Sequence, residues 1–154
     1  MASAEQLNSF LVDMFGRINK IEERVMAEGL GSAVSITEIH IIEKIGALEP
    51  IRMSEVARSI GVTLATLTVA CDKLEAKDLV RRSRDKSDRR VVNVTLTDKG
   101  RVAYEYHRAF HDRMIASVMD TLSPEQAAIL AQSLEKLQDF FQQEEAGMGG
   151  AANG

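Results

Sequence analysis

The segment 80–101 concentrates positive charge in a chain that is acidic overall. It holds eight basic residues against three aspartates, a local charge of +5, whereas the whole 154-residue chain carries −4. The basic residues are Arg81, Arg82, Arg84, Lys86, Arg89, Arg90, Lys99 and Arg101. Because contacts to phosphates supply much of a protein's affinity for a nucleic acid, charge confined to one short element suits a polyanion-binding surface. An ordinary solvated face is the alternative interpretation.

The three histidines are the second group of residues that could do chemistry. His107 and His111 lie four residues apart, a spacing that places both on one face of a helix. With His40 and the carboxylate of Glu22, they offer four ligands for a divalent metal. The alternative is a structural role, around a ligand pocket or in a hydrogen-bond network between helices. Both interpretations stay open, and no cofactor is expected to be required.

The composition narrows the class of protein. With 45% hydrophobic and 27% charged residues, the chain is expected to fold as a globular domain with a core. It has no apolar run of about 18 residues and no secretory signal, so we expect a cytoplasmic protein without a membrane partner. Cys71, the single cysteine, is expected on a buried helix face, where a thiol is a poor redox switch. Few aromatic residues are available to stack on single strands, so duplex DNA is the better candidate partner.

The basic segment follows a pattern that is typical of a helix-turn-helix. A short helix is predicted over 54–60, with Ser54 able to cap it, followed by a turn at 61–63 and a longer helix capped by Thr63. Strands are predicted over 79–83 and 91–96, with the polar residues between them at the tip of a hairpin. A hairpin directly after a helix-turn-helix makes a winged helix, and its tip carries the charge.

Long helices are predicted on either side of this central domain. Apolar residues recur at helical spacing over 6–28, and the capping box Ser35–Glu38 begins a second helix that Pro50 ends. A fifth helix is expected to begin near Asp98 and a sixth behind a capping box at Ser123. The apolar stripes of the first and last helices are wider than so small a domain can cover, which favours a homodimer that binds a pseudo-palindromic site.

The predicted fold class is mainly α with a small β wing, a winged helix-turn-helix flanked by dimerisation helices. The expected domains are an N-terminal dimerisation helix (1–34), a DNA-binding domain (35–97), C-terminal dimerisation helices (98–145) and a disordered tail (146–154).

The second helix of the helix-turn-helix is expected to enter the major groove. The residues off its core face are Leu64, Ala65, Thr66, Thr68, Val69 and Lys73. Threonine hydroxyls can bond base edges or phosphates, and the apolar members can touch thymine methyl groups, so an A/T-rich operator is expected. Arg89 and Arg90 are candidates for the minor groove. The remaining candidates, for phosphate contacts, are Ser54, Arg81, Arg82, Arg84 and Lys86.

An apolar effector pocket is predicted between the first, second and fifth helices. Flexible methionines and other apolar side chains suit an adaptable pocket, although core packing explains any one of them as well. The candidate lining residues are Met14, Phe15, Ile18, Ile39, His40, Ile42, His107, Phe110, His111 and Met114.

The wing sequence resembles that of the MarR family of bacterial transcriptional regulators. The shared pattern is Asp88-Arg89-Arg90 followed by Leu96-Thr97-Asp98-Lys99-Gly100, and the resemblance extends from the first helix to Phe141. It implies that Arg90 reaches the minor groove while Asp88 holds the wing loop. The chain departs from many members at Asp78, where they have Gly, and at Val69, where they have Arg.

Within this family, the segments 36–40, 62–68, 88–92 and 107–111 are similar to the repressors of fatty-acid synthesis in Gram-positive bacteria. The resemblance implies a repressor whose effector is a long acyl group carried on acyl carrier protein. Zinc-sensing members have a comparable Glu and three His, so a zinc-responsive repressor is an alternative.

The sequence also bears on two other classes of function, an enzyme and a protein-interaction module. No nucleophile with its base, phosphate-binding loop or dinucleotide motif is present, so the chain is not expected to be an enzyme. A winged-helix protein-interaction module remains an alternative, but such a module does not need arginines at the wing tip of an acidic chain.

Overall fold

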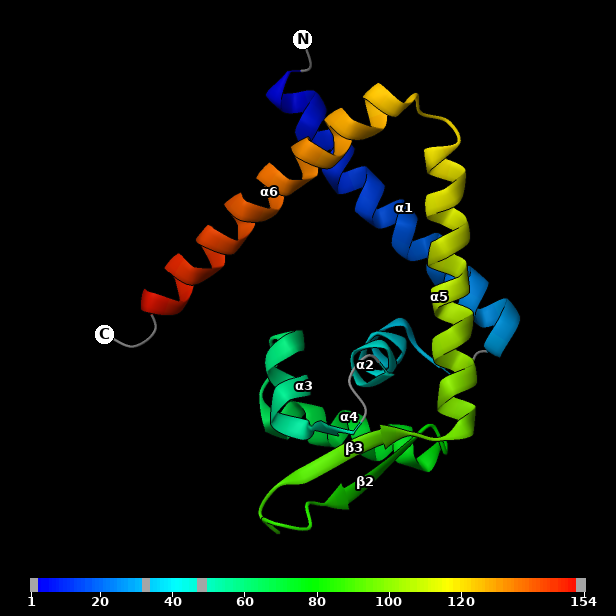
Figure 1. Ribbon diagram of the computed structural model, residues 1–154, viewed down its shortest axis with the longest axis vertical. Coiled ribbons are helices and arrows are strands. Elements are labelled where there is room, and N and C mark those ends of the chain that lie inside the picture. The colour runs from blue at the N-terminus through cyan, green and yellow to red at the C-terminus, as the bar shows by residue number, and fades with distance from the viewer. Residues whose placement is uncertain (1–2, 32–33, 47–49, 152–154) are drawn as a thin grey trace. The chain divides into compact units, whose positions relative to one another are not determined.

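The computed structural model describes residues 3–31, 34–46 and 50–151. The elements, in chain order, are α1 (Ala4–Leu30), α2 (Ile36–Gly46), β1 (Ile51–Arg52), α3 (Met53–Ile60), α4 (Leu64–Ala76), β2 (Val80–Arg84), β3 (Val92–Leu96), α5 (Asp98–Met119) and α6 (Pro124–Ala151) (Figure 1). This arrangement confirms the predicted class, mainly helical with a small antiparallel sheet. In the described residues, no helix is long and apolar enough to cross a membrane.

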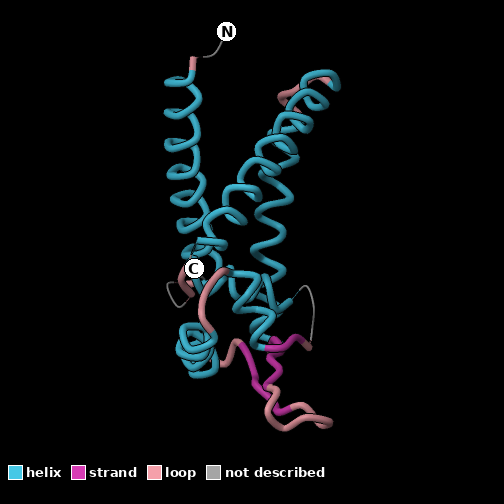
Figure 2. Tube along the Cα trace, turned by 90° about the vertical axis from the view of Figure 1, so that its left-hand side faces the viewer, coloured by secondary structure: helices cyan, strands magenta, loops and turns pink. Residues whose placement is uncertain are grey.

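The winged helix is built on a core that α2, α3, α4 and the sheet share. Its fully buried side chains include Ile39, Ile42, Leu67, Leu74 and Val94. The strands follow the order β1-β3-β2, and β2 pairs antiparallel with β3. The hairpin of β2 and β3 projects beyond the helices, as the magenta strands show (Figure 2). The sequence analysis missed β1, because two residues are too few for an alternating pattern to be visible.

Local capping signals place most helix starts correctly. The Ser35 backbone N–H donates to Glu38 Oε2 (2.8 Å), and the Glu38 backbone N–H donates to Ser35 Oγ (3.3 Å). Thr63 Oγ1 accepts from the Thr66 backbone N–H (3.1 Å) at the start of α4. These side chains satisfy amide groups that a helix leaves unpaired in its first turn.

Ser54 is not the cap of α3, which corrects the sequence prediction. The helix begins at Met53, and Arg52 occupies the cap position without a side-chain hydrogen bond to the helix. Strand β1 leads directly into α3, so Ser54 falls within the first turn and remains exposed.

Two backbone features join the end of α4 to the wing and to α5. Asp78 has a φ of 57°, a left-handed conformation that Asp tolerates better than most residues. At Gly100, an added Cβ would lie 2.0 Å from the Leu79 carbonyl oxygen, so any side chain there would force α5 away from the start of the wing. The glycine that follows Leu96-Thr97 is therefore explained by close packing.

The chain forms two compact units, Met1–His111 and Asp112–Gly154. The division falls inside α5 and not at the predicted boundary between residues 97 and 98. The first half of α5 belongs to the first unit because Ala103, His107 and Phe110 are buried there.

In the second unit, α6 begins as the sequence predicts. The Ser123 backbone N–H donates to Gln126 Oε1 (2.8 Å), and the Gln126 backbone N–H donates to Ser123 Oγ (3.2 Å). The helix continues to Ala151 and so includes residues 146–151 of the tail for which disorder was predicted, and residues 152–154 lie outside the described residues. An established helix gains a hydrogen bond with each added residue, and no proline interrupts this segment.

Candidate nucleic-acid interface and histidine cluster

Helix α4 has one buried face and one exposed face, as predicted. Leu67, Cys71 and Leu74 are buried, whereas Leu64 and Val69 are 50% and 59% exposed. The other residues of α4 that were predicted to contact DNA are exposed (Ala65, Thr66 and Lys73) or half-buried (Thr68). Exposed aliphatic side chains on a helix next to a basic hairpin are suited to contact thymine methyl groups.

Arg90 stands out at the wing tip, with its side chain 91% exposed. Asp88 holds it in place: the Arg90 Nε donates to Asp88 Oδ1 (3.1 Å), its Nη2 to Oδ2 (3.2 Å), and its backbone N–H to Oδ1 (3.0 Å). These hydrogen bonds lower the pKa of Asp88. The guanidinium therefore points outward beside Asp88, and the bond from the Arg90 backbone N–H ties the same carboxylate to the wing loop.

Asp85 organises the wing tip, and the sequence analysis did not single it out. Its carboxylate accepts from the hydroxyl and backbone N–H of Ser87, from the backbone N–H of Asp88 (3.1 Å) and from Asn93 Nδ2 (3.3 Å). The hydrogen bonds from Ser87 are the main reason that the pKa of Asp85 lies far below its usual value. An aspartate two residues before a serine in a polar loop is a common turn signal, and it could have identified this residue.

Arg82 points to helix α4, which corrects its predicted role as a phosphate contact. Its Nη2 lies 2.5 Å from both Glu75 Oε2 and Asp72 Oδ1, and its side chain is only 22% exposed. The pKa of Glu75 is lowered by the hydrogen bond from Arg82. Side chains alternate along a strand, so Arg82 lies on the same face as the buried Val80, whereas Arg81 lies on the opposite face and is exposed.

A hollow of about 270 Å³ lies between the start of α3, helix α4 and the wing. Its lining residues are Arg52, Met53, Ser54, Leu64, Thr68, Arg82, Arg90, Val91 and Val92. Five predicted DNA-binding residues therefore line one hollow: Ser54, Leu64, Thr68, Arg82 and Arg90. Arg52 joins them, although the sequence analysis missed it because it lies outside the basic segment.

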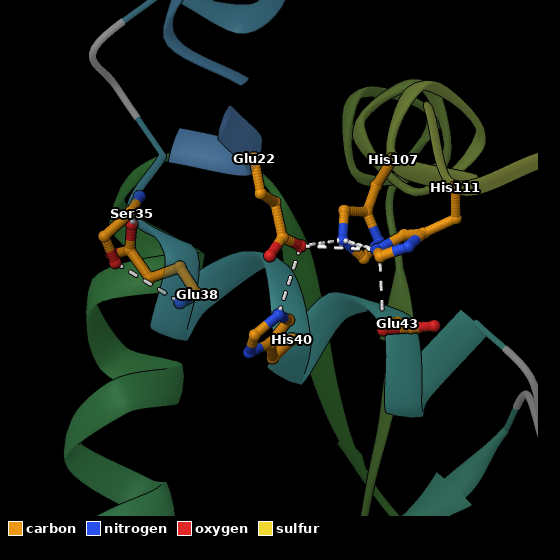
Figure 3. Close-up of polar contacts among 7 residues, drawn as sticks. All are labelled: Glu22, Ser35, Glu38, His40, Glu43, His107 and His111. Atoms are coloured by element: carbon orange, nitrogen blue, oxygen red, sulfur yellow. Dashed lines mark hydrogen bonds and ion pairs between the residues drawn. The ribbon is translucent and has the colours of Figure 1, made fainter. Parts of the chain in front are cut away.

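The three histidines converge on Glu22, as the sequence analysis expected (Figure 3). Glu22 Oε1 is 3.2 Å from His40 Nε2 and 3.4 Å from His111 Nε2, and it forms a short hydrogen bond with His107 Nε2. Glu22 and His107 are both buried. Burial would raise the pKa of Glu22, but the hydrogen bonds and charges of His107 and His40 outweigh it, so this pKa is lowered.

One nitrogen of the cluster lacks a partner. His107 Nδ1 is buried and makes no hydrogen bond within the described part of the chain. Glu43 Oε2 lies 3.8 Å from it. A shift of a few tenths of an ångström would let Glu43 accept from this nitrogen and fix the orientation of the ring.

The residues predicted to line an effector pocket lie in different surroundings. A hollow of about 560 Å³ lies along α1, lined by Gln6, Ser9, Phe10, Asp13, Met14, Arg17 and Ile18. Only Met14 and Ile18 of the predicted set line it. Ile39 and Ile42 are fully buried and belong to the core, because α2 packs at the centre of the first unit. Phe110 is buried and Phe15 is exposed, while Met114 lies in the second unit.

Cys71 is buried on the inner face of α4, as expected. Burial raises the pKa of its thiol to about 11, so the reactive thiolate is scarce at neutral pH.

An exposed helix beside an arginine-tipped hairpin, on a winged helix-turn-helix, defines a DNA-binding protein. The comparison with known proteins agrees. Residues 34–92 match the MarR family. FabT from Streptococcus pneumoniae, solved in complex with DNA, is 33% identical, with a TM-score of 0.89 over 92% of this chain and 99% of that chain. This chain belongs to the MarR family of transcriptional regulators.

Curated relatives support the same conclusion. The transcriptional repressor MdtR of Bacillus subtilis is 26% identical, and the match covers 89% of each chain. The transcriptional regulator ZitR of Lactococcus lactis is also 26% identical, over 92% of this chain and 99% of that protein. The resemblance seen in the sequence is confirmed, and the protein is a DNA-binding transcriptional regulator, not an enzyme.

Proposed function

We propose that this MarR family protein is a cytoplasmic homodimeric repressor of fatty-acid or lipid synthesis genes, and that it binds a pseudo-palindromic, A/T-rich operator. The main support for DNA binding is that two exposed side chains, Leu64 of α4 and Arg90 of the wing, line the same hollow. Arginine is drawn to narrow minor grooves, which A/T-rich DNA provides.

Self-association is supported by apolar side chains on the long helices. In α1, Leu7, Phe10 and Phe15 are exposed, and the separate unit containing α6 exposes Leu134 and Phe141. Large apolar side chains exposed along a helix are typical of an interface, and a symmetric dimer would present two winged helices to one operator.

An acyl group on acyl carrier protein is the effector that we propose. The hollow along α1 offers apolar contacts from Phe10, Met14 and Ile18, and methionine side chains adapt to flexible chains. The full-length similarity to FabT agrees with the sequence segments that resemble Gram-positive fatty-acid repressors.

The proposal is tested by measuring affinity for the promoter DNA of the chain's own gene by fluorescence anisotropy. The additions are long-chain acylated acyl carrier protein, the unacylated carrier protein, zinc, or nothing. We expect only the acylated carrier to change the dissociation constant, and by linkage DNA must change the affinity for the carrier by the same factor. A change with zinc alone would refute the acyl effector.

A zinc-responsive repressor is the second candidate, and the histidine cluster favours it. One carboxylate and three imidazoles form a donor set that zinc can take. Glu22, His107 and His111 hold their ligand atoms close enough together for one ion, and His40, 3.2 Å from Glu22, would be the fourth ligand. The unpartnered His107 Nδ1 near Glu43 fits an outer contact of the kind that orients a metal-bound histidine. A bound ion would tie α1, α2 and α5 together.

Zinc binding is measured by competition with a chromophoric chelator. Glu22→Gln is expected to weaken it by about 10-fold to 100-fold or more, whereas Glu23→Gln, on an exposed neighbour, serves as the matched control. Equal zinc affinity in both variants would exclude the cluster as the site.

A further inference from the structure

We propose that Arg82 is a positioning residue that sets the angle between helix α4 and the wing, and that it acts through Glu75 and Asp72 without touching DNA. This inference rests on the proposed DNA interface, because it concerns how the two elements of that interface are held. Arg82, Glu75 and Asp72 are called the wing clamp below.

The wing clamp joins two elements that the chain connects only through a short turn. The Glu75 carboxylate accepts from the backbone N–H of Arg82 (2.9 Å) and from its Nε (3.0 Å), so it fixes both the strand and the side chain. Asp72, nearly one turn earlier on α4, takes a further hydrogen bond from the guanidinium. A planar guanidinium with several fixed donors can bridge two carboxylates in this way, and an ammonium group cannot reproduce that geometry.

The position of the clamp explains why it matters for DNA binding. The turn after α4 passes through Asp78, whose left-handed conformation redirects the chain from α4 into β2. Arg82 follows that turn by four residues and leads along β2 towards the tip that carries Arg90. Loss of the clamp would let the hairpin change its angle to α4, so that Leu64 and Arg90 no longer match one stretch of duplex.

The charges of Arg82 and Glu75 distinguish this proposal from a direct contact between Arg82 and a phosphate, because the two models predict different effects of substitution on DNA binding. If Arg82 contacted a phosphate, its removal would reduce the salt dependence of binding by about one unit of slope, as for any phosphate contact. Glu75, an acidic group beside the interface, would repel DNA in that case, and its neutralisation would strengthen binding. The wing clamp predicts instead that removal of Arg82 leaves the salt slope unchanged and that neutralisation of Glu75 weakens binding.

The test compares Arg82→Met, Glu75→Gln and the double variant, with Arg81→Met as the matched control on the opposite face of β2. Dissociation constants for the specific promoter duplex and a scrambled duplex are measured over a range of salt concentrations. We expect Arg82→Met and Glu75→Gln each to weaken specific binding by about threefold to tenfold, with the salt slope unchanged. The double variant should be no weaker than either single variant, whereas Arg81→Met should reduce the slope.

Arg82→Lys separates positioning from charge. Lysine retains the positive charge but lacks the planar guanidinium that bridges two carboxylates. We therefore expect Arg82→Lys to weaken binding to the specific duplex nearly as much as Arg82→Met does. Circular dichroism and thermal melting show whether each variant is folded, and Glu75→Gln and Arg82→Lys decide the question if Arg82→Met fails to fold.

Tighter binding by Glu75→Gln, or a reduced salt slope for Arg82→Met, would overturn the wing clamp. In that case the wild type still binds its promoter, and the proposed function stands. A wild-type chain that does not distinguish its promoter from scrambled DNA overturns both.

Discussion

In both the wing tip and the histidine cluster, acidic side chains accept several hydrogen bonds. The wing tip is directed at solvent, however, whereas the histidine cluster is directed into the fold. At the wing tip, Asp85 and Asp88 satisfy the loop and leave Arg90 directed at solvent. In the cluster, Glu22 is buried and faces three imidazoles, while His107 Nδ1 makes no hydrogen bond in the described part of the chain and lies 3.8 Å from Glu43 Oε2. The first arrangement suits a large external polyanion, and the second suits a small ligand or a structural network inside the fold.

The two regions also differ in how their charges are stabilised. The pKa of Asp88 is lowered chiefly by its hydrogen bonds to Arg90, whereas burial opposes the lowered pKa of Glu22 and histidine contacts must overcome it. We therefore expect substitutions at the wing to change binding and substitutions in the cluster to change stability.

The largest effect is expected for Arg90→Ala. Because this side chain is almost fully exposed, its removal should leave the fold intact and weaken binding to the promoter duplex by about 1–3 kcal/mol. Fluorescence anisotropy gives the affinity, and Arg24→Ala, an exposed cation on α1, is the control. Equal affinity of the two variants would remove Arg90 from the interface.

A somewhat smaller effect is expected for Glu22→Gln, and on stability instead of DNA contact. The buried His107 would lose its charged partner, so the free energy of unfolding should fall by about 1–2 kcal/mol. Urea denaturation measures it, with Glu23→Gln expected within about 0.5 kcal/mol of the wild type. If the two variants are equally stable, the contrast between an inward and an outward region is wrong.

Asp85→Ala is expected to weaken promoter binding less than Arg90→Ala does. The wing tip would lose the carboxylate that orders Ser87 and Asp88, although the interface would lose a negative charge as well. Anisotropy titrations of both variants against the promoter duplex show how much of the affinity depends on an ordered wing loop. Stronger binding by Asp85→Ala would show that charge alone governs the wing.

The smallest effect concerns pH and Glu75. Its folded-state pKa lies below the ordinary value of 4.5, so its contribution to stability is present above about pH 4.5 and is lost as the pH falls through the folded value. The stability difference between wild type and Glu75→Gln should therefore be greatest near neutral pH and shrink below pH 4.5. A difference that does not change with pH would contradict the ion pair with Arg82.

Much of the fold could be predicted because its signals are local. The capping residues Ser35, Thr63 and Ser123 act within four residues of themselves, and the alternation of Val92, Val94 and Leu96 marks a strand directly. The pairing of His107 with His111 also followed from helical spacing, since residues four apart share one face of a helix whatever packs against it.

The features that were missed depend on tertiary contacts. Arg82 looks like any other cation of the basic segment until β2 is placed against α4, where Glu75 and Asp72 bind it. In the sequence, Ile39 and Ile42 fit the lining of an apolar pocket as well as they fit a core. Only the central position of α2 in the folded unit shows that they belong to the core. Arg52 and the short strand β1 carry no periodic pattern at all.

The central claim is that the exposed face of α4 and the tip of the wing read duplex DNA together. It is tested most directly by titrating the wild-type chain into its own promoter duplex and into a scrambled duplex of equal length at physiological salt. The account predicts binding to the promoter at least about 10³-fold tighter, with two chains per site. Equal and weak affinity for both duplexes would contradict it.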